Sequence, residues 1–166
     1  MNNEKKITVS FTGHRDCDNL DNEALCEAIR TLYRDGYRIF LCGMARGFDL
    51  AAGECVLSLQ NELSGLQLRC IIPFRGHDKS FSKADRERYQ QLTLHADQVI
   101  TLSEGYQAGA YHFRNDYLVD NSSAIIAYYN GSRGGTHYTL HRAVKRGLRI
   151  VNICLFRLNE LFSDLK

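Results

Sequence analysis

Short apolar runs alternate along the chain with longer segments in which apolar and polar positions follow a helical period. The apolar runs are unbroken and rich in β-branched residues, which is typical of strands covered on both faces. We expect strands at 7–12, 38–42, 68–73, 98–102, 124–129 and 149–153. The segments between them predict helices at 21–36, 47–63, 82–96, 111–122 and 135–147.

Regular alternation of strands and helices favours a parallel sheet with right-handed crossovers. The sequence therefore predicts an α/β fold: an open, mainly parallel sheet of about six strands with helices on both faces. No repeat or linker-like stretch interrupts residues 1–166, which we interpret as one domain. Residues 155–166 carry leucines at helical spacing and predict a C-terminal amphipathic helix, which packs on the domain or on a second copy in a homodimer.

Charge and cysteine content narrow the range of partners. The 166 residues include 21 Lys and Arg against 19 Asp and Glu, and this balance does not favour a nucleic-acid partner. No apolar run reaches the length of a membrane span or of a signal-peptide core, so we expect a cytoplasmic protein without membrane contact. The six cysteines form no Cys-x-x-Cys pair and have no histidine at ligand spacing. We therefore expect reduced thiols and no metal site.

In an open α/β sheet, ligands bind beyond the carboxyl ends of the strands, so the turns after each strand are the candidate site. The turn after the first strand offers a glycine and side chains suited to phosphate: Thr12, Gly13, His14 and Arg15. The turn after the second strand offers Gly43, Arg46 and Gly47 at a helix start, where free N–H groups favour an anion. Asp49 follows, either as a first-turn carboxylate or as an acceptor for a ribose hydroxyl.

Three later segments add to this picture. Phe74, after the third strand, is suited to stacking on a base. After the fourth strand, Arg114 and Asn115 supply donors and an acceptor for a nucleotide, although a surface helix also explains them. After the fifth strand, a turn opens a helix with residues suited to phosphate: Gly134, Gly135 and Thr136. Each turn alone is compatible with an ordinary loop, but together they predict one anion site at a single edge of the sheet.

The ordered set of turns resembles the YpsA-like branch of the SLOG (Smf/DprA–LOG) superfamily of Rossmann-like proteins. The resemblance rests on FTGHR, GMARGFDLAAGE, RNDYLVDNSSAIIAYYNG and RGGTHYTLHRAVKRG, and it covers nearly the whole chain. It implies a Rossmann-like sheet with a nucleotide-type ligand pocket built from the first two turns and the late Gly-Gly-Thr. A ligand related to ADP-ribose or NAD is compatible with such a pocket, and the sequence indicates no other cofactor.

Some members of this superfamily cleave the N-glycosidic bond of nucleoside monophosphates, and others bind single-stranded DNA. The hydrolases carry a Pro-Gly-Gly-x-Gly-Thr-x-x-Glu motif whose glutamate serves the chemistry. The matching stretch here lacks the proline and has Thr139 at the glutamate position. A hydrolase would therefore need another carboxylate, because an oxocarbenium-like centre requires one. Candidates are Asp49 and Glu54 first, then Asp116 and Asp120.

Three functional hypotheses follow. The first is a cytosolic nucleotide-derivative-binding protein, a sensor or ligand-handling module that holds a phosphate-bearing small molecule at the glycine-rich turns. The alternative is a phosphoribohydrolase-like enzyme acting on nucleotides. The third is a single-stranded DNA-binding module, suggested by the basic cluster Arg142, Lys145, Arg146 and Arg149. These charges also have a structural explanation, because cations near a helix C-terminus stabilise the helix.

Overall fold

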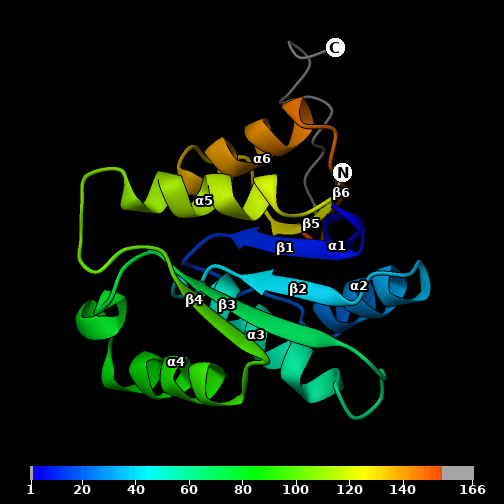
Figure 1. Cartoon of the computed structure of the whole chain (residues 1–166), viewed down its shortest axis with the longest axis horizontal. Coiled ribbons are helices and arrows are strands. Elements are labelled where there is room, and N and C mark those ends of the chain that lie inside the picture. Colours follow the sequence, from blue (N-terminus) through cyan, green and yellow to red (C-terminus); the bar gives the residue numbers. More distant parts are fainter. Residues whose placement is uncertain (1, 155–166) are drawn as a thin grey trace.

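All six predicted strands are present and form one parallel sheet. The computed structural model describes residues 2–154. The strands are β1 (Thr8–Gly13), β2 (Ile39–Cys42), β3 (Gln67–Ile72), β4 (Gln98–Thr101), β5 (Ala124–Tyr128) and β6 (Arg149–Asn152). They lie in the order β4-β3-β2-β1-β5-β6, and every neighbouring pair is parallel (Figure 1). The predicted sheet is confirmed.

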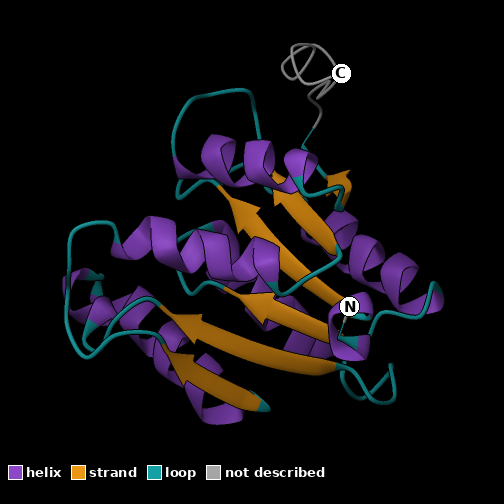
Figure 2. Cartoon of the chain, turned by 45° about the horizontal axis from the view of Figure 1, so that its top comes forward, coloured by secondary structure: helices purple, strands orange, loops and turns teal. Residues whose placement is uncertain are grey.

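Helices cover both faces of the sheet, as predicted. They are α1 (Asn3–Lys6), α2 (Asn22–Arg34), α3 (Phe48–Leu59), α4 (Lys83–His95), α5 (Ala110–Asp120), α6 (Gly135–Lys145) and the 3-10 helix η1 (His77–Ser80). Helices α2, α3 and α4 lie on one face, and α5 and α6 lie on the other (Figures 1 and 2). The pattern does not predict α1 and η1, because each spans only four residues and shows no apolar period.

Helix α2 shows how the pattern fixes a helix and its orientation. Asp21 caps the N-terminus, its side-chain oxygen accepting the N–H of Ala24 at 3.1 Å. Leu25, Ile29 and Leu32 form the predicted stripe and are fully buried. Burying each such side chain contributes about 1.5–3 kcal/mol, so the stripe decides which side of the helix meets the sheet.

The chain order places a ligand crevice beside β1. From β1 the chain adds β2, β3 and β4 on one side, and then crosses to the other side of β1 to add β5 and β6. The direction of winding therefore reverses between β1 and β5, where Gly13 pairs with Tyr128. In open α/β sheets, the carboxyl ends of the strands at such a reversal frame the ligand site.

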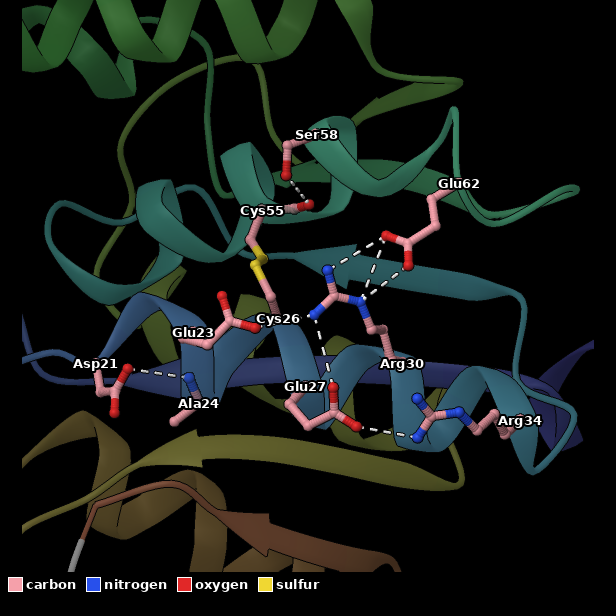
Figure 3. Close-up of polar contacts among 10 residues, drawn as sticks. All are labelled: Asp21, Glu23, Ala24, Cys26, Glu27, Arg30, Arg34, Cys55, Ser58 and Glu62. Carbon is pink, nitrogen blue, oxygen red and sulfur yellow. Dashed lines mark hydrogen bonds and ion pairs between the residues drawn. A yellow bond between two sulfur atoms is a disulfide. The ribbon is translucent and has the colours of Figure 1, made fainter.

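Helices α2 and α3 are joined by a covalent link and by ion pairs (Figure 3). Cys26 and Cys55 form a disulfide, with Cα atoms 6.1 Å apart. Arg30 of α2 forms an ion pair with Glu62, which follows α3, and a second ion pair with Glu27 within α2 itself. The expectation of reduced thiols is wrong for this cysteine pair, because the packing of α2 on α3 brings together two residues 29 positions apart. The free cysteines are Cys17, Cys42, Cys70 and Cys154.

Some expectations stay predictions. The amphipathic helix at 155–166 lies outside the described residues. The one-domain organisation and the cytoplasmic location also stay predictions. Among the helices of residues 2–154, none combines the length and the apolar character needed to span a bilayer.

Candidate functional site

A cavity of about 470 Å³ lies at the carboxyl end of the sheet, beside the reversal between β1 and β5. Its walls come from the end of β1 and the following turn, the start of α3, and helices α5 and α6. The lining residues are Phe11, Thr12, Gly13, His14, Arg15, Ala45, Asp49, Tyr111, His112, Arg114, Asn115, Leu118, Gly135 and Thr136. The structure thus brings together most of the ligand residues predicted from four separate turns.

The start of α6 has the features of an anion site. The helix begins at Gly135, and its N-cap, Gly134, has no side chain to satisfy the first N–H groups. Thr12 and Thr136 line the same cavity, and each is only 7% exposed. Within residues 2–154, neither hydroxyl group has a hydrogen-bond partner. Uncapped N–H groups and two cavity-lining hydroxyls are donors suited to a phosphate group.

Arg114 and Asn115 of α5 form one polar wall of the cavity. The Nε of Arg114 donates to the Oδ1 of Asn115 at 2.9 Å, and its Nη1 donates to the carbonyl oxygen of Gly43. The Nδ2 of Asn115 lies 3.6 Å from the position that a Cβ on Gly135 would occupy. Asn115 therefore has its oxygen held by Arg114, while its N–H donors lie near the start of α6.

Asp49 of α3 is a buried carboxyl group in the cavity wall, 5% exposed. Its Oδ2 accepts the main-chain N–H of Ala45 at 3.1 Å. Burial raises the pKa of Asp49 to about 6, although Arg114, this N–H and Arg15 favour the charged form. Gly43 makes room for the arrangement, because a Cβ there would stand 3.0 Å from both the Oδ2 of Asp49 and the Cδ of Arg114. A carboxyl group in this setting can gain or lose its proton near neutral pH.

Gly13 and Gly47 bring the start of α3 against the end of β1. A Cβ on Gly13 would overlap the ring of Phe48, and a Cβ on Gly47 would overlap the main-chain carbonyl of Arg15. The N–H of Phe48 donates to the carbonyl oxygen of His14 at 3.2 Å, which holds this contact. Gly13 lines the cavity, whereas Gly47 does not, so close packing accounts for Gly47 without a phosphate.

His14 and Arg15 occupy the turn after β1. The Nε2 of His14 accepts the main-chain N–H of Asn130 at 3.1 Å, which ties this turn to the one after β5. Burial lowers the pKa of His14, in agreement with a neutral ring that accepts a hydrogen bond. Arg15 is exposed at the cavity and forms no ion pair within residues 2–154. Arg46, predicted to act beside it, lines a smaller neighbouring cavity instead.

Tyr111 lines the cavity where Phe74 was expected. Phe74 is 9% exposed and packs against Tyr111, with ring centres 5.8 Å apart, and it is not part of the cavity wall. His112 also lines the cavity, and its ring contacts that of Tyr138, with centres 4.4 Å apart. Sequence reasoning did not select Tyr111 or His112 as ligand residues. The one feature of the sequence that could have indicated these two residues is their position in the first turn of a helix that follows a strand.

Comparisons with known proteins show the family and the fold of the chain. The model of the YspA SLOG family matches residues 11–156. The chain belongs to the YspA SLOG family. The uncharacterized SPbeta prophage-derived protein YoqJ of Bacillus subtilis (strain 168) is 32% identical over 118 residues, which are 64% of this chain and 69% of YoqJ. A UPF0398 protein of Bacillus cereus (strain B4264) is 28% identical over 147 residues, which are 87% of this chain and 78% of that protein.

Two solved structures share the fold of this SLOG chain. DNA processing protein A (DprA) from Streptococcus pneumoniae superposes with a TM-score of 0.63 at 20% identity, covering 88% of this chain. The chain spans only 50% of that protein. DprA from Helicobacter pylori, studied for its single-stranded DNA binding mode, gives a TM-score of 0.64 at 18% identity and covers 96% of this chain and 73% of its own. At these identities the likeness shows the fold alone.

Of the four candidate carboxylates in this SLOG chain, Asp49 is the one that lines the cavity. Glu54, further along α3, forms an ion pair with a side chain of α4. Asp116 and Asp120 of α5 both pair with Arg142 of α6. The four carboxylates also do not form a metal site. In residues 2–154, no three His, Cys, Asp or Glu side chains are grouped to hold a metal ion.

The basic cluster of this SLOG chain is largely neutralised by ion pairs. Arg142 and Arg146 pair with Asp120, at 2.9 and 3.8 Å respectively. Arg149 pairs with Asp35 at 2.6 Å. The cluster therefore offers little unpaired positive charge to a DNA backbone, whose binding depends on such charge.

Next to the cavity, His77 is a buried and uncharged histidine. It is 4% exposed, and its Nδ1 has no hydrogen-bond partner within the described chain. Burial lowers its pKa to about 3, and Arg114 and Arg15 act in the same direction. The unfolded chain binds this proton near pH 6.5, but the folded chain does not until about pH 3. Lowering the pH through this interval therefore favours unfolding.

Replacing His77 by phenylalanine is expected to remove this acid sensitivity. Asp49 acts in the opposite direction between about pH 4 and 6, because its folded pKa is raised and the folded state holds the proton more tightly. Wild type and His77→Phe share that contribution, so it cancels in their difference. The stability of the variant relative to wild type should rise as pH falls from 6.5, by up to about 1.4 kcal/mol per pH unit. Urea unfolding across this range measures it, and parallel curves would contradict a neutral His77.

Proposed function

We propose that this SLOG chain binds a phosphate-bearing, nucleotide-type small molecule in the cavity beside β1 and β5. The observation that carries the proposal is the pair of hydroxyls of Thr12 and Thr136, which line the cavity, have no partner in residues 2–154 and lie beside the uncapped start of α6. A phosphate oxygen bound there would give each hydroxyl the hydrogen bond that it lacks within residues 2–154.

The rest of the cavity suits the remainder of a nucleotide. Asn115 presents amide donors next to the phosphate end, and Asp49 can accept a ribose hydroxyl when it is ionised. Tyr111 lines the cavity with an aromatic ring that can contact a base. Arg15 supplies an unpaired charge to balance the phosphate. A volume of about 470 Å³ falls within the usual range for small-molecule sites.

The test is thermal stabilisation of the protein by AMP, GMP, CMP and UMP, each compared with its nucleoside. A ligand that binds only the folded state raises the melting temperature by mass action. We expect Thr136→Val to weaken nucleotide binding by about tenfold or more and nucleoside binding little, because it removes one donor to the phosphate.

Thr139→Val is the matched control. Thr139 lies one turn further along α6, and its hydroxyl donates to the carbonyl oxygen of Gly135 at 2.8 Å without lining the cavity. The control should bind nucleotides like wild type. Equal weakening in both variants would show that Thr136 acts through the helix rather than through the phosphate, and no binding of any nucleotide would refute the proposal.

A second candidate function, N-glycosidic hydrolysis, is favoured by the raised pKa of Asp49. In that reaction, water adds to the C1′ carbon as the C1′–N bond breaks, and the departing base takes the proton of the Asp49 carboxyl group. The water loses one proton as it adds, and this proton restores the Asp49 carboxyl group. Mass spectrometry of the recovered ligand distinguishes the two functions. Free base and ribose phosphate, formed by wild type and not by Asp49→Asn, would support hydrolysis, whereas intact nucleotide would support binding alone.

A further inference from the structure

The walls of the main cavity supply many hydrogen-bond donors and few free acceptors. Of the described residues that line it, Asp49 is the only acidic one. Two further side-chain acceptors are already engaged, since the Oδ1 of Asn115 accepts the Nε–H of Arg114 and the Nε2 of His14 accepts the main-chain N–H of Asn130. A ligand therefore meets Asp49 as the one anionic acceptor that the described part of the chain places there.

One oxygen of this carboxyl group is open to the cavity. The Oδ2 of Asp49 accepts the main-chain N–H of Ala45, whereas no group of residues 2–154 donates to its Oδ1. The fully enclosed side-chain atoms without a hydrogen bond in this part of the chain belong to His77 and Arg142, so the Oδ1 of Asp49 is not enclosed. An acceptor that lacks a partner, in a residue only 5% exposed, calls for a donor from a ligand.

Asp49 lies one side chain away from the proposed phosphate end. Asn115, whose amide lies near the start of α6, is bonded to Arg114. The Cδ of Arg114 and the Oδ2 of Asp49 each lie 3.0 Å from the position that a Cβ on Gly43 would occupy, so Asn115 and Asp49 both adjoin the Arg114 side chain. In a nucleotide the sugar follows the phosphate directly, and the edge of the base lies further away. The part of the ligand that reaches Asp49 is therefore the sugar.

We propose that the free oxygen of Asp49 accepts hydrogen bonds from the ribose hydroxyls of the ligand, so that this site selects a ribonucleotide with a free 2′,3′ diol. The inference rests on the function proposed above and names the ligand class of the same cavity. The two hydroxyls of ribose are donors on adjacent carbon atoms, and a carboxylate oxygen has two lone pairs that can accept them.

This recognition separates a free nucleotide from a nucleic-acid strand. An internal nucleotide of DNA lacks the 2′-hydroxyl, and its 3′ oxygen is esterified, so its sugar has no hydroxyl to donate. Its 3′ phosphate would also bring a negative charge toward the carboxylate of Asp49, and like charges repel. The chain is therefore expected to hold single ribonucleotides and to reject DNA at this cavity, although it shares the fold of DNA processing protein A.

The charge state of Asp49 suits this role. Burial raises its pKa to about 6, so the carboxyl group is mainly ionised at pH 7.5, and Arg114 and Arg15 favour the ionised form. A hydrogen bond to an ionised acceptor is stronger than one between neutral groups. Loss of the donor from the ligand should therefore be measurable as a loss of affinity.

The experiment measures, by calorimetry on the full chain at pH 7.5, the affinity for AMP, GMP, CMP and UMP and for the 2′,3′-dideoxy analogue of each. Wild type should bind each ribonucleotide about tenfold more tightly than its dideoxy analogue, the gain expected of a hydrogen bond to a charged group. The affinities of the 2′-deoxy and 3′-deoxy analogues should lie between these two, because each keeps one donor.

Asp49→Asn tests the assignment to this residue. In the variant, the amide oxygen accepts the N–H of Ala45 and the amide nitrogen faces the cavity, so a neutral donor replaces the anionic acceptor. The preference for the ribonucleotide should fall to about twofold or less. Glu54→Gln is the matched control, because it makes the same change of charge on the same helix. Glu54 pairs with Arg88 and is not among the residues that line the cavity, so this variant should keep the preference.

Equal affinity of wild type for a ribonucleotide and its dideoxy analogue would overturn ribose recognition and leave the proposed function standing. This comparison needs no substitution, so it holds even where Asp49→Asn does not fold. A full preference in Asp49→Asn, or a lost preference in Glu54→Gln, would overturn the assignment to the Asp49 carboxylate. Absence of any nucleotide binding by wild type would overturn both proposals.

Discussion

Replacing Gly47 by alanine is expected to lower the free energy of unfolding by about 3 kcal/mol or more. The added Cβ would overlap the main-chain carbonyl of Arg15, which cannot move aside as the end of a flexible side chain can. In addition, Gly47 has a φ of +79°, a conformation that residues with a Cβ rarely adopt. The urea dependence of unfolding measures the loss.

Gly65→Ala separates the two causes. Gly65 has a φ of +80°, but a Cβ there would meet nothing closer than the Cδ of Arg38 at 3.9 Å. This control also places a Cβ at a positive φ, at a cost of about 1 kcal/mol, and lacks the overlap. Similar losses in both variants would mean that α3 can shift away from the turn after β1, contrary to the tight packing described above.

Removing the Arg114 side chain is expected to destabilise the fold by about 3–5 kcal/mol at pH 7.5. Arg114 and Asp49 are each 5% exposed, so the truncation leaves a buried carboxylate without its compensating charge. The truncation also leaves the carbonyl oxygen of Gly43 without its donor. Arg114→Ala should lose less stability at pH 5.5, where Asp49 is protonated and no longer needs a cation.

The double variant Arg114→Ala, Asp49→Asn completes a double-mutant cycle with the two single variants, which measures the coupling between Arg114 and Asp49. Because the amide that replaces the Asp49 carboxyl group carries no charge, the double variant should lose less stability than the two single losses added together. Losses that simply add would show that Arg114 stabilises the fold by packing and by its hydrogen bonds to Gly43 and Asn115, independently of Asp49. The comparison is made at pH 7.5, where the carboxyl of Asp49 is ionised.

The secondary structure was predictable because each element carries its own signal. The buried strands β2 and β5 are unbroken apolar runs, β1 alternates Val9 and Phe11 with Thr and Ser, and the stripe of α2 repeats at helical spacing. Helices α1 and η1 are too short for such a pattern. The disulfide joins Cys26 and Cys55, and their spacing of 29 residues carries no signal, because only the packing of α2 on α3 makes them neighbours.

The candidate site was predictable as a set of turns but not as a set of side chains. The rule that ligands lie beyond strand ends does not say which strands lie near the reversal. Phe74 follows β3, which is separated from β1 by β2, and so it packs beside the cavity rather than in it. Glu54 lies five residues after Asp49, a rotation of roughly 140° around the helix, which turns it toward α4.

The reversal between β1 and β5 also bears on how the protein folds. The strand at the centre of the sheet is the first one synthesised, yet its partner β5 is separated from it by most of the chain, and the bond from Asn130 to His14 spans 116 residues. Contacts of such long range are slow to form, because the loop between them must be ordered first. During synthesis, the edge of β1 that pairs with β5 therefore stays unpaired until residues 124–128 have left the ribosome. The ligand cavity cannot exist before α6, its last wall, has been made.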